Sequence, residues 1–409
     1  MLPPIRVSLT LADLWSSATR GDPAAPERLE EAFAARFGFP HAILFPYARS
    51  ALCAMVKAFG WHGRKIACPA YTCAVVPLTA AASGNTPMLA DSAPDHFLPG
   101  SEQWAAAIAP ETAMMIVTPL YGYPVDKSCE EHARRRAPGI FVLYDEAQSC
   151  GVTDDAGFQS RDADGALFSL GTGKMLSALS GGMILLRGSD AYREVRRLRD
   201  TRYTRPSLIH TLKLAMRGLA AWAALREPMF SVLCALGQAI PKMSFDRIGD
   251  RELLLADLPS DAETLASAYQ ANIGLRMLGR LGALLQGGRK LGEYYDRRLR
   301  KEGFRTFPHH ASPIFTRYPL AVANRTGVLA AAAAEGIHLG RYVSYSSANA
   351  PSLGSDSRSY PNAELWGRCM INLPNWNGLE IRDAERCVSL LLKLATTVPE
   401  AVAWPKEAK

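Results

Sequence analysis

Five short apolar runs, with helical patterns between most of them, constrain the fold of this chain more than any other feature. Each run is four or five residues long: His41–Phe45, Lys65–Cys68, Pro87–Ala90, Met114–Thr118 and Ile140–Tyr144. This alternation predicts an α/β fold, in which a mostly parallel sheet is flanked by helices. Ligands bind outside the carboxyl ends of the strands in such sheets, so the residues that directly follow the runs are candidates for function.

The length of 409 residues exceeds that of one ordinary domain and predicts a large domain with a smaller one. We expect an N-terminal segment over residues 1–27 and a large α/β domain over 28–300. A small α+β domain is expected over 301–409, with strands at Ser312–Tyr318 and Met370–Leu373.

Residues 205–260 are predicted to form an apolar, helical insertion in the large domain. An arginine-rich run ends at Arg205, and a largely apolar stretch follows from Leu208 to Ile240. The pattern favours a helical hairpin that packs on the body of the protein or on a partner subunit. The less favoured alternative is a basic amphipathic surface that touches a membrane or a lipid-linked sugar.

Composition excludes several classes of protein. Hydrophobic residues make up 48% of the chain and charged residues 21%, as in ordinary globular enzymes. The net charge of +7 suits anionic partners, including phosphorylated or nucleotide-linked substrates. No basic patch interleaved with aromatic residues indicates nucleic-acid binding, and the eight histidines lack the spacing of metal ligands.

Cysteine usage and the N-terminus predict a cytoplasmic protein. The eight cysteines are scattered and form no C-x-x-C pair, which is typical of reduced thiols rather than a disulfide framework. The first residues lack the apolar core of a signal peptide, and no stretch has the roughly 18 uncharged apolar residues of a membrane-spanning helix.

An acid and a lysine follow two apolar runs at a spacing that brings two strand ends to one site. The run Ile140–Tyr144 ends in Asp145, and a later run ends in Ser169, with Lys174 in the glycine-rich turn beyond it. Pyridoxal phosphate needs a lysine for covalent attachment and proton transfer and an acid that keeps its pyridine nitrogen protonated. Burial in such a turn can lower the pKa of a lysine toward the nucleophilic range. We therefore predict a pyridoxal phosphate site, with Lys174 as the catalytic lysine and Asp145 against the ring nitrogen.

Other residues complete this site. Gln148 can reach the ring oxygen of the cofactor, and Ser169 can join its phosphate cradle. Arg49 and Ser50 lie between a strand and a helix that is expected over 51–59, where free backbone N–H groups suit a phosphate. Each feature also has an ordinary structural explanation, as a strand-end cap, a solvated loop lysine or a plain βα turn. A nucleotide-binding P-loop is excluded, because Phe168 occupies the position of its first glycine.

The motifs together resemble the DegT/DnrJ/EryC1/StrS family of sugar aminotransferases, which have the aspartate-aminotransferase-type fold (pyridoxal-phosphate-dependent transferase fold type I). The resemblance lies in Asp145 with Gln148, then Ser169 with Lys174, then Gly181-Gly182. Weaker matches accompany these motifs: Ala48-Arg49-Ser50-Ala51-Leu52 at the family's phosphate turn, Pro69-Ala70-Tyr71-Thr72, Pro119–Pro124, Pro361–Glu364 and Leu373-Pro374. The resemblance implies that Ala48, Arg49 and Ser50 bind the cofactor phosphate.

Several positions depart from the family pattern. Cys73 stands where the family has an aromatic residue on the ring of the cofactor, and it is the cofactor-binding candidate at that position. Cys150 replaces a common histidine. The segment whose asparagine reaches the neighbouring subunit's cofactor aligns with Glu263-Thr264-Leu265-Ala266, which does not match it.

The resemblance implies a homodimeric transaminase with its active site at the subunit interface. The enzyme would transfer an amino group from glutamate to a nucleotide-linked keto-sugar, as a step in glycan or secondary-metabolite biosynthesis. Lysine at position 174 argues against the family's dehydratases, which have histidine there. Two alternatives stay open: elimination or carbon–carbon bond chemistry on an amino acid, and a non-catalytic cofactor-binding sensor or partner subunit.

Overall fold

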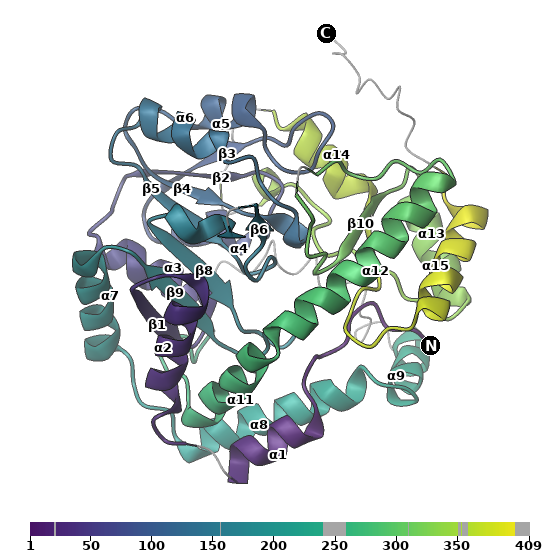
Figure 1. Ribbon diagram of the computed structural model, residues 1–409, viewed down its shortest axis with the longest axis horizontal. Coiled ribbons are helices and arrows are strands. Elements are labelled where there is room, and N and C mark those ends of the chain that lie inside the picture. The colour runs from purple at the N-terminus through teal and green to yellow at the C-terminus, as the bar shows by residue number, and fades with distance from the viewer. Residues whose placement is uncertain are drawn as a thin grey trace.

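A seven-stranded sheet forms the centre of the molecule (Figure 1). The computed structural model describes residues 1–19, 22–155, 157–239, 259–309, 311–350, 353 and 359–396. The strands of the central sheet are β1 (His41–Phe45), β2 (Lys65–Pro69), β3 (Thr86–Ala90), β4 (Thr112–Val117), β5 (Phe141–Asp145), β8 (Gly165–Ser169) and β9 (Gly182–Leu186). The predicted α/β fold is confirmed, and each of the five apolar runs coincides with a strand to within two residues.

The sheet is parallel except around β9. Its order is β1-β9-β8-β5-β4-β2-β3, and β9 runs antiparallel to both of its neighbours. A loop joins β8 to β9. Because this connection has no crossover helix of the kind that parallel neighbours need, β9 runs antiparallel to β8. That loop contains Lys174.

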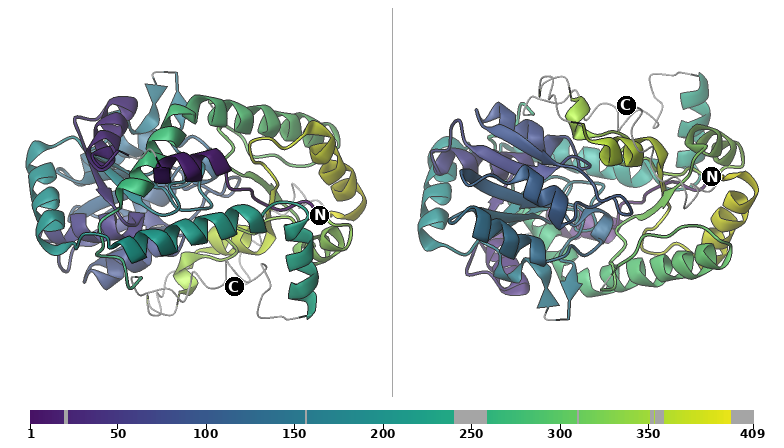
Figure 2. Two further views of the ribbon diagram at one scale, coloured as in Figure 1. Left: turned by 90° about the horizontal axis from the view of Figure 1, so that it is seen from below. Right: turned by 90° about the horizontal axis from the view of Figure 1, so that it is seen from above.

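Helices flank the sheet on its two faces (Figures 1 and 2). One of them, α3, packs on β1, β8 and β9 and contacts α4 and α7, while α2 packs on β1 and β9 and contacts α11. The helices of this part of the chain are α1 (Leu11–Thr19), α2 (Ala25–Phe37), α3 (Ala48–Ala58), α4 (Val75–Ala82), α5 (Ser101–Ala107), α6 (Ser128–Arg136), α7 (Ser189–Arg202), α11 (Ala268–Gly279) and α12 (Leu281–Lys301).

The C-terminal elements gather at one end of the molecule (Figure 2). They surround a two-stranded antiparallel sheet of β10 (Tyr318–Ala321) and β11 (Met370–Leu373). The helices here are α13 (Arg325–Ala334), α14 (Pro361–Cys369) and α15 (Ile381–Leu394), and α12 packs on α15. The N-terminus lies at the same end, because Leu2 bridges to Ile337.

The strand predicted at Ser312–Tyr318 is wrong except for its last residue, where β10 begins. The backbone N–H groups of Ile314 and Thr316 donate instead to the carbonyls of Gly122 and Tyr121, both at 3.0 Å. Between them Phe315 has a φ of 45°, a left-handed conformation that interrupts an extended strand. The segment therefore lies against the loop after β4 and borders the site described below.

Two helices form the described part of the apolar insertion. They are α8 (Leu208–Ala224) and α9 (Met229–Ala239), and the described part of the chain resumes at residue 259. The axes of the two helices meet at 90°. In Figure 1 α8 runs along one edge of the molecule beside α1, with which it is in contact.

Candidate active site

The structure brings Asp145, Ser169 and Lys174 to one edge of the sheet. Neighbouring strands β5 and β8 are parallel, and Asp145 pairs with Leu167, so both strands end at the same edge. Lys174 lies in the turn after β8, where its backbone N–H donates to the Gly171 carbonyl at 2.9 Å.

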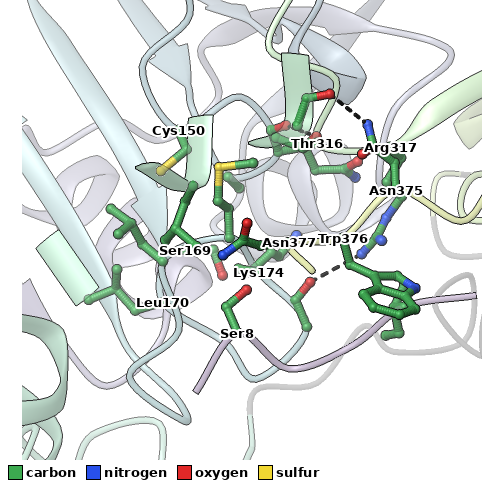
Figure 3. A pocket seen from close by; sticks show the side chains of 18 of the residues that line it. Ser8, Cys150, Ser169, Leu170, Lys174, Thr316, Arg317, Asn375, Trp376 and Asn377 are labelled. Carbon is green, nitrogen blue, oxygen red and sulfur yellow. Dashed lines mark hydrogen bonds between the residues drawn. The ribbon is translucent and has the colours of Figure 1, made fainter. Parts of the chain in front are cut away.

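A cavity lies at this edge, between the sheet and the C-terminal elements (Figure 3). Of the predicted site residues, Gln148, Ser169 and Lys174 line it. Its other walls come from four separate parts of the chain: Ile5, Arg6 and Ser8; Glu146, Ala147, Cys150, Phe168, Leu170, Gly173, Met175 and Leu176; Leu284, Gly288, Thr316 and Arg317; and Asn375, Trp376 and Asn377. Lys174 therefore shares the cavity with residues that come more than 160 positions before it in the sequence and with others that come more than 160 positions after it.

Asp145 is a buried acid with few partners. Its side chain is 5% exposed and accepts a hydrogen bond from the backbone N–H of Ala147 at 3.1 Å. Burial raises the pKa of this carboxyl above its ordinary value, and the Ala147 hydrogen bond and the Lys174 charge oppose that rise. A buried carboxylate of this kind is stabilised by a cation placed against it.

The side chain of Lys174 makes no hydrogen bond or ion pair with any of the described residues. Its amine lies 5.8 Å from the centre of the Tyr342 ring. Arg317 covers the same ring at 3.7 Å and donates to the Gly173 carbonyl at 3.1 Å. Arg317 thus holds the turn before Lys174 and leaves the lysine amine directed into the cavity.

Two amide side chains in the cavity have buried oxygens without a hydrogen-bond partner among the described residues: Gln148 Oε1 and Asn375 Oδ1. The Asn375 amide nitrogen donates to the carbonyls of Phe315 at 2.6 Å and Gly288 at 3.2 Å, which fixes its orientation. The great majority of buried polar atoms in proteins have hydrogen-bond partners, so these two oxygens are acceptors that suit a polar ligand or water in the cavity.

The predicted phosphate turn lies in the first turn of α3, and not ahead of it as expected. Tyr47 has an extended backbone and its carbonyl accepts the first helical hydrogen bond from Ala51, so Ala48, Arg49 and Ser50 are already helical. Their backbone N–H groups therefore belong to a helix N-terminus, where anions bind.

The strand register places this helix end near Ser169. Phe45, Gly182 and Ser169 are paired across β1, β9 and β8, and α3 begins three residues after Phe45. Two strand spacings correspond to about 10 Å, a distance that a phosphate-bearing cofactor can span.

The segment 261–263 covers the N-terminus of α3. The Ser50 hydroxyl donates to the Ala262 carbonyl at 2.8 Å, and the Tyr47 hydroxyl donates to the Asp261 carboxylate at 2.8 Å. Burial, together with this carboxylate, raises the pKa of Tyr47 to about 12. The hydroxyl proton of Ser50 is therefore already in use, and it does not remain for a phosphate.

Cys73 lies outside the set of residues that line the cavity. The backbone N–H of Ala74, next to it, donates to the Tyr345 hydroxyl at 3.1 Å. The place of Cys73 against the ring of a cofactor stays a prediction.

Three arginines that the sequence did not single out border a second cavity of about 310 Å³, which shares Arg6, Ser8, Leu284 and Asn377 with the first. They are Arg6, Arg226 and Arg280, and the Nε atom of each is buried without a hydrogen-bond partner among the described residues. Burial and the nearby Arg226 lower the pKa of Arg6. Because these arginines come from three distant segments, no local pattern could have indicated their meeting.

Partners hold each of the three guanidinium groups in place. Arg6 lies over the Trp376 ring at 4.2 Å, and Arg226 lies over Trp222 at 4.5 Å. Arg280 donates to the Asp13 carboxylate at 2.6 Å. Such a cluster is suited to a multiply charged anion.

Comparison with known families gives one clear match. The model of the DegT/DnrJ/EryC1/StrS aminotransferase family matches residues 16–237. The dTDP-4-amino-4,6-dideoxy-D-glucose transaminase of Shigella dysenteriae is 26% identical over 177 residues, which are 43% of this chain and 48% of that protein. The GDP-perosamine synthase of Caulobacter vibrioides is 30% identical over 172 residues, 42% of this chain and 46% of that protein. The chain thus matches about half the length of these relatives.

Solved structures resemble this chain over nearly its whole length. DesI, determined in the presence of its TDP-sugar product, has a TM-score of 0.72 at 20% identity and covers 96% of this chain and 93% of its own. The sugar aminotransferase CalS13 of Micromonospora echinospora has a TM-score of 0.73 at 19% identity, and the match covers 96% of this chain and 100% of CalS13. A sugar aminotransferase of Streptococcus pneumoniae, Spr1654, described as putative and in its PMP form, has a TM-score of 0.74 at 17% identity, with coverage of 96% and 98%. At these identities the likeness establishes the fold.

Proposed function

Because the chain belongs to the DegT/DnrJ/EryC1/StrS aminotransferase family, we propose that it is a pyridoxal 5'-phosphate-dependent transaminase. It transfers an amino group from glutamate to a keto-sugar that is linked to a nucleotide. The observation that carries this proposal is that buried Asp145 lies at the carboxyl end of β5, within electrostatic reach of the Lys174 amine, which lines the cavity beyond the ends of β5 and β8.

The chain's own polar groups fit the cofactor. Asp145 is a buried carboxylate that lacks a strong cationic partner, as required of a group that lies against a protonated ring nitrogen. The unpaired buried oxygen of Gln148 shows that this amide has spare hydrogen-bonding capacity beside the cavity. The cofactor phosphate is assigned to the backbone N–H groups of Ala48, Arg49 and Ser50 and to the Ser169 hydroxyl, and Cys73 is proposed at the ring face.

When bound, pyridoxal phosphate supplies the carbonyl group and the electron-withdrawing ring that transamination needs. Lys174 binds the cofactor and then moves the proton at the reacting carbon of the substrate. Its amine reaches the cavity without a competing ion pair, so it is available for both tasks. Asp145 holds a proton on the ring nitrogen, and Arg317 positions the turn that carries Lys174.

Two wider features belong to the same proposal. A homodimer with its active site at the subunit interface and a cytoplasmic location are expected from the family. The large domain over residues 28–300, with its insertion, and the small domain over 301–409 are proposed as its structural division.

The arginine cavity supports a phosphate-bearing acceptor. Arg6, Arg226 and Arg280 lie beside the cavity that contains Lys174, and their buried Nε donors are available to phosphate oxygens. We assign this cavity to the diphosphate of the nucleotide. The Arg226→Met variant is expected to raise KM for the nucleotide-linked sugar about tenfold or more, with kcat much less affected. The control is Arg193→Met, since Arg193 is exposed and pairs with exposed Asp190.

The primary test is spectroscopic. Purified protein supplied with pyridoxal phosphate should absorb in the near-violet region and lose this band in Lys174→Ala. Addition of L-glutamate should then change this absorbance band and release 2-oxoglutarate. When a panel of nucleotide-linked keto-sugars is added, mass spectrometry should detect an aminated product. A protein that binds the cofactor but reacts with no amino donor would be a sensor or partner subunit. Conversion of amino acids without an aminated sugar would favour elimination or carbon–carbon bond chemistry.

A further inference from the structure

Arg317 is a buried cation that has no acid partner among the described residues. It is 9% exposed, and the described part of the chain gives it no ion pair. One guanidinium nitrogen donates to the Gly173 carbonyl at 3.1 Å, and no described residue accepts a hydrogen bond from its other N–H groups. A buried charge is costly unless an opposite charge and hydrogen bonds compensate it. Arg317 therefore has unused capacity to bind an anion.

Two contacts hold this guanidinium group in place. Its carbon lies 3.7 Å from the centre of the Tyr342 ring, and the Tyr342 backbone N–H donates to the Asn372 side chain at 2.9 Å. The bond to the Gly173 carbonyl fixes one edge of the group. A planar group that is already ordered loses little freedom on binding, so Arg317 is prepared for a planar anion such as a carboxylate.

The cavity that contains Lys174 has an excess of positive charge. Its described lining includes the cations Arg6, Lys174 and Arg317, and Glu146 is the one acid among these lining residues. The Glu146 carboxyl accepts a hydrogen bond from the Gly151 backbone N–H at 2.9 Å and forms no ion pair with Arg317. An anionic ligand would therefore complement the charge of this cavity.

Arg317 and Lys174 lie beside the same aromatic ring. The Lys174 amine is 5.8 Å from the centre of the Tyr342 ring, so the two cations cannot be farther apart than this distance and the 3.7 Å of Arg317 together. Both residues line one cavity (Figure 3). An α-amino acid carries its amino group and its carboxylate on the same carbon. A residue that binds this carboxylate must therefore lie near the lysine at which the amino group reacts.

The phosphate groups of the proposed reaction have other sites. Arg317 does not line the cavity that Arg6, Arg226 and Arg280 border, which is assigned to the diphosphate of the acceptor. The cofactor phosphate is assigned to the N-terminus of α3. The anion that matches Arg317 is therefore a carboxylate, which arginine binds through two parallel N–H···O bonds.

We propose that Arg317 binds the α-carboxylate of the amino donor beside Lys174. This assignment rests on the proposed transaminase function and adds the group that selects the donor, an amino acid and not a simple amine. The carboxylate neutralises the buried guanidinium group, and the α-carbon is thereby held next to the lysine that moves its proton. Tyr342 is a positioning residue, because it acts through the guanidinium group.

The half-reaction with the amino donor tests this proposal. Protein loaded with pyridoxal phosphate is mixed with L-glutamate, and the change of the near-violet band gives an apparent Kd and a limiting rate. Arg317→Met should raise the apparent Kd about tenfold to a hundredfold, and Arg317→Lys should recover part of this loss because it keeps the charge. The KM for the nucleotide-linked sugar should change by less than about threefold.

A donor without the α-carboxylate separates binding from a structural role. In the wild type, 4-aminobutyrate should react at least about tenfold more slowly than L-glutamate, and Arg317→Met should change its rate by less than about threefold. A displaced turn at Lys174 would instead slow both donors by the same factor. Tyr342→Leu should raise the apparent Kd for L-glutamate about fivefold, and Tyr342→Phe, which keeps the ring, should change it little.

The control variant is Arg298→Met. Arg298 is also partly buried, at 26% side-chain exposure, but its guanidinium group pairs with Glu385 at 2.9 Å and with Glu302 at 2.8 Å. The apparent Kd for L-glutamate should stay within about twofold of the wild-type value. Titration of each variant with pyridoxal phosphate, followed by the near-violet band, checks that the cofactor still binds.

Three results would overturn the role of Arg317 alone. The first is an Arg317→Met variant that binds L-glutamate as tightly as the wild type does. The second is an equal loss of rate with L-glutamate and 4-aminobutyrate, which would leave Arg317 only its contact with the turn of Lys174. The third is weaker cofactor binding with an unchanged donor Kd, which would assign Arg317 to the cofactor phosphate. A wild type whose band responds to no amino donor would instead refute the proposed transaminase function itself.

Discussion

Gly182 is the residue at which a single methyl group should disturb both folding and cofactor binding. It is the first residue of β9, and a Cβ atom there would lie 2.3 Å from the Ala48 nitrogen and 2.4 Å from the Tyr47 carbonyl carbon. Ordinary contact begins at 3.4 Å, so the Gly182→Ala variant must move the start of α3 away from β9 by about 1 Å. The atoms struck belong to the backbone, and they cannot rotate aside as a side chain could.

The cost follows from this displacement. Overpacking of a tight interior typically destabilises a protein by about 1–3 kcal/mol, and a shift of about 1 Å in a binding constellation can weaken function about a hundredfold. We therefore expect Gly182→Ala to lower the free energy of unfolding by about 2 kcal/mol and to weaken pyridoxal phosphate binding by about ten- to a hundredfold. Denaturant titration of the cofactor-free protein gives the first quantity, and titration of the near-violet absorbance gives the second.

The control for this prediction is Gly188→Ala. The nearest atom to a Cβ at Gly188 is the Cβ of Ala191 at 3.8 Å, which is ordinary contact. Loss of less than about 1 kcal/mol is expected there, since Gly188 is only the N-cap of α7. If Gly182→Ala unfolded at the same denaturant concentration as the wild type and bound the cofactor equally well, the close approach of β9 to α3 would not hold the phosphate site as argued.

Two further predictions concern buried charges. Arg199→Met should destabilise the protein by about 3 kcal/mol or more, because Arg199 pairs with buried Glu30 and donates to the Leu44 carbonyl at 3.1 Å. Denaturant unfolding measures this loss of stability. The control is Arg197→Met, which should change stability by less than about 0.5 kcal/mol, because the Arg197 side chain is 71% exposed. Asp145→Asn should raise the melting temperature of the cofactor-free protein at pH 7. Burial raises the pKa of Asp145 above its ordinary value of 3.8, so the wild type loses stability as pH rises from 3.8 to the folded-state pKa, and the advantage of the variant should vanish below pH 3.8. An equal difference between variant and wild type at pH 3 and pH 7 would contradict this explanation.

The arginines of the run that ends at Arg205 have two different roles, and only the structure distinguishes them. Arg199 is buried and ties α7 to β1 and α2 through Leu44 and Glu30, so it stabilises the fold. Arg193 and Arg197 are exposed and pair with acids three residues earlier on the same helix. The sequence shows six arginines in one run, and their spacing alone does not distinguish these roles.

The sequence by itself determined the α/β fold, the family and the paired strand ends with Asp145 and Lys174. These depend on local patterns, namely short apolar runs and the residues that directly follow them, which one stretch of chain carries in full. Only the tertiary structure decided what surrounds Lys174. Arg6, Arg226, Arg280 and Asn375 meet near the cavity from segments far apart in the chain.

The same limit applies to the strand prediction that was wrong and to the prediction for the apolar insertion, which stays a prediction. Ser312–Tyr318 has the composition of a strand, but its hydrogen bonds go to the loop at Tyr121 and Gly122, which no local pattern reveals. For α8, the sequence favoured a helical hairpin that packs on the body of the protein or on a partner subunit, because apolar side chains predict burial. Whether a given side of a helix meets the protein or solvent depends on the neighbours that the fold supplies, and here Leu214 and Gly218 are covered while Leu212 and Met216 are not.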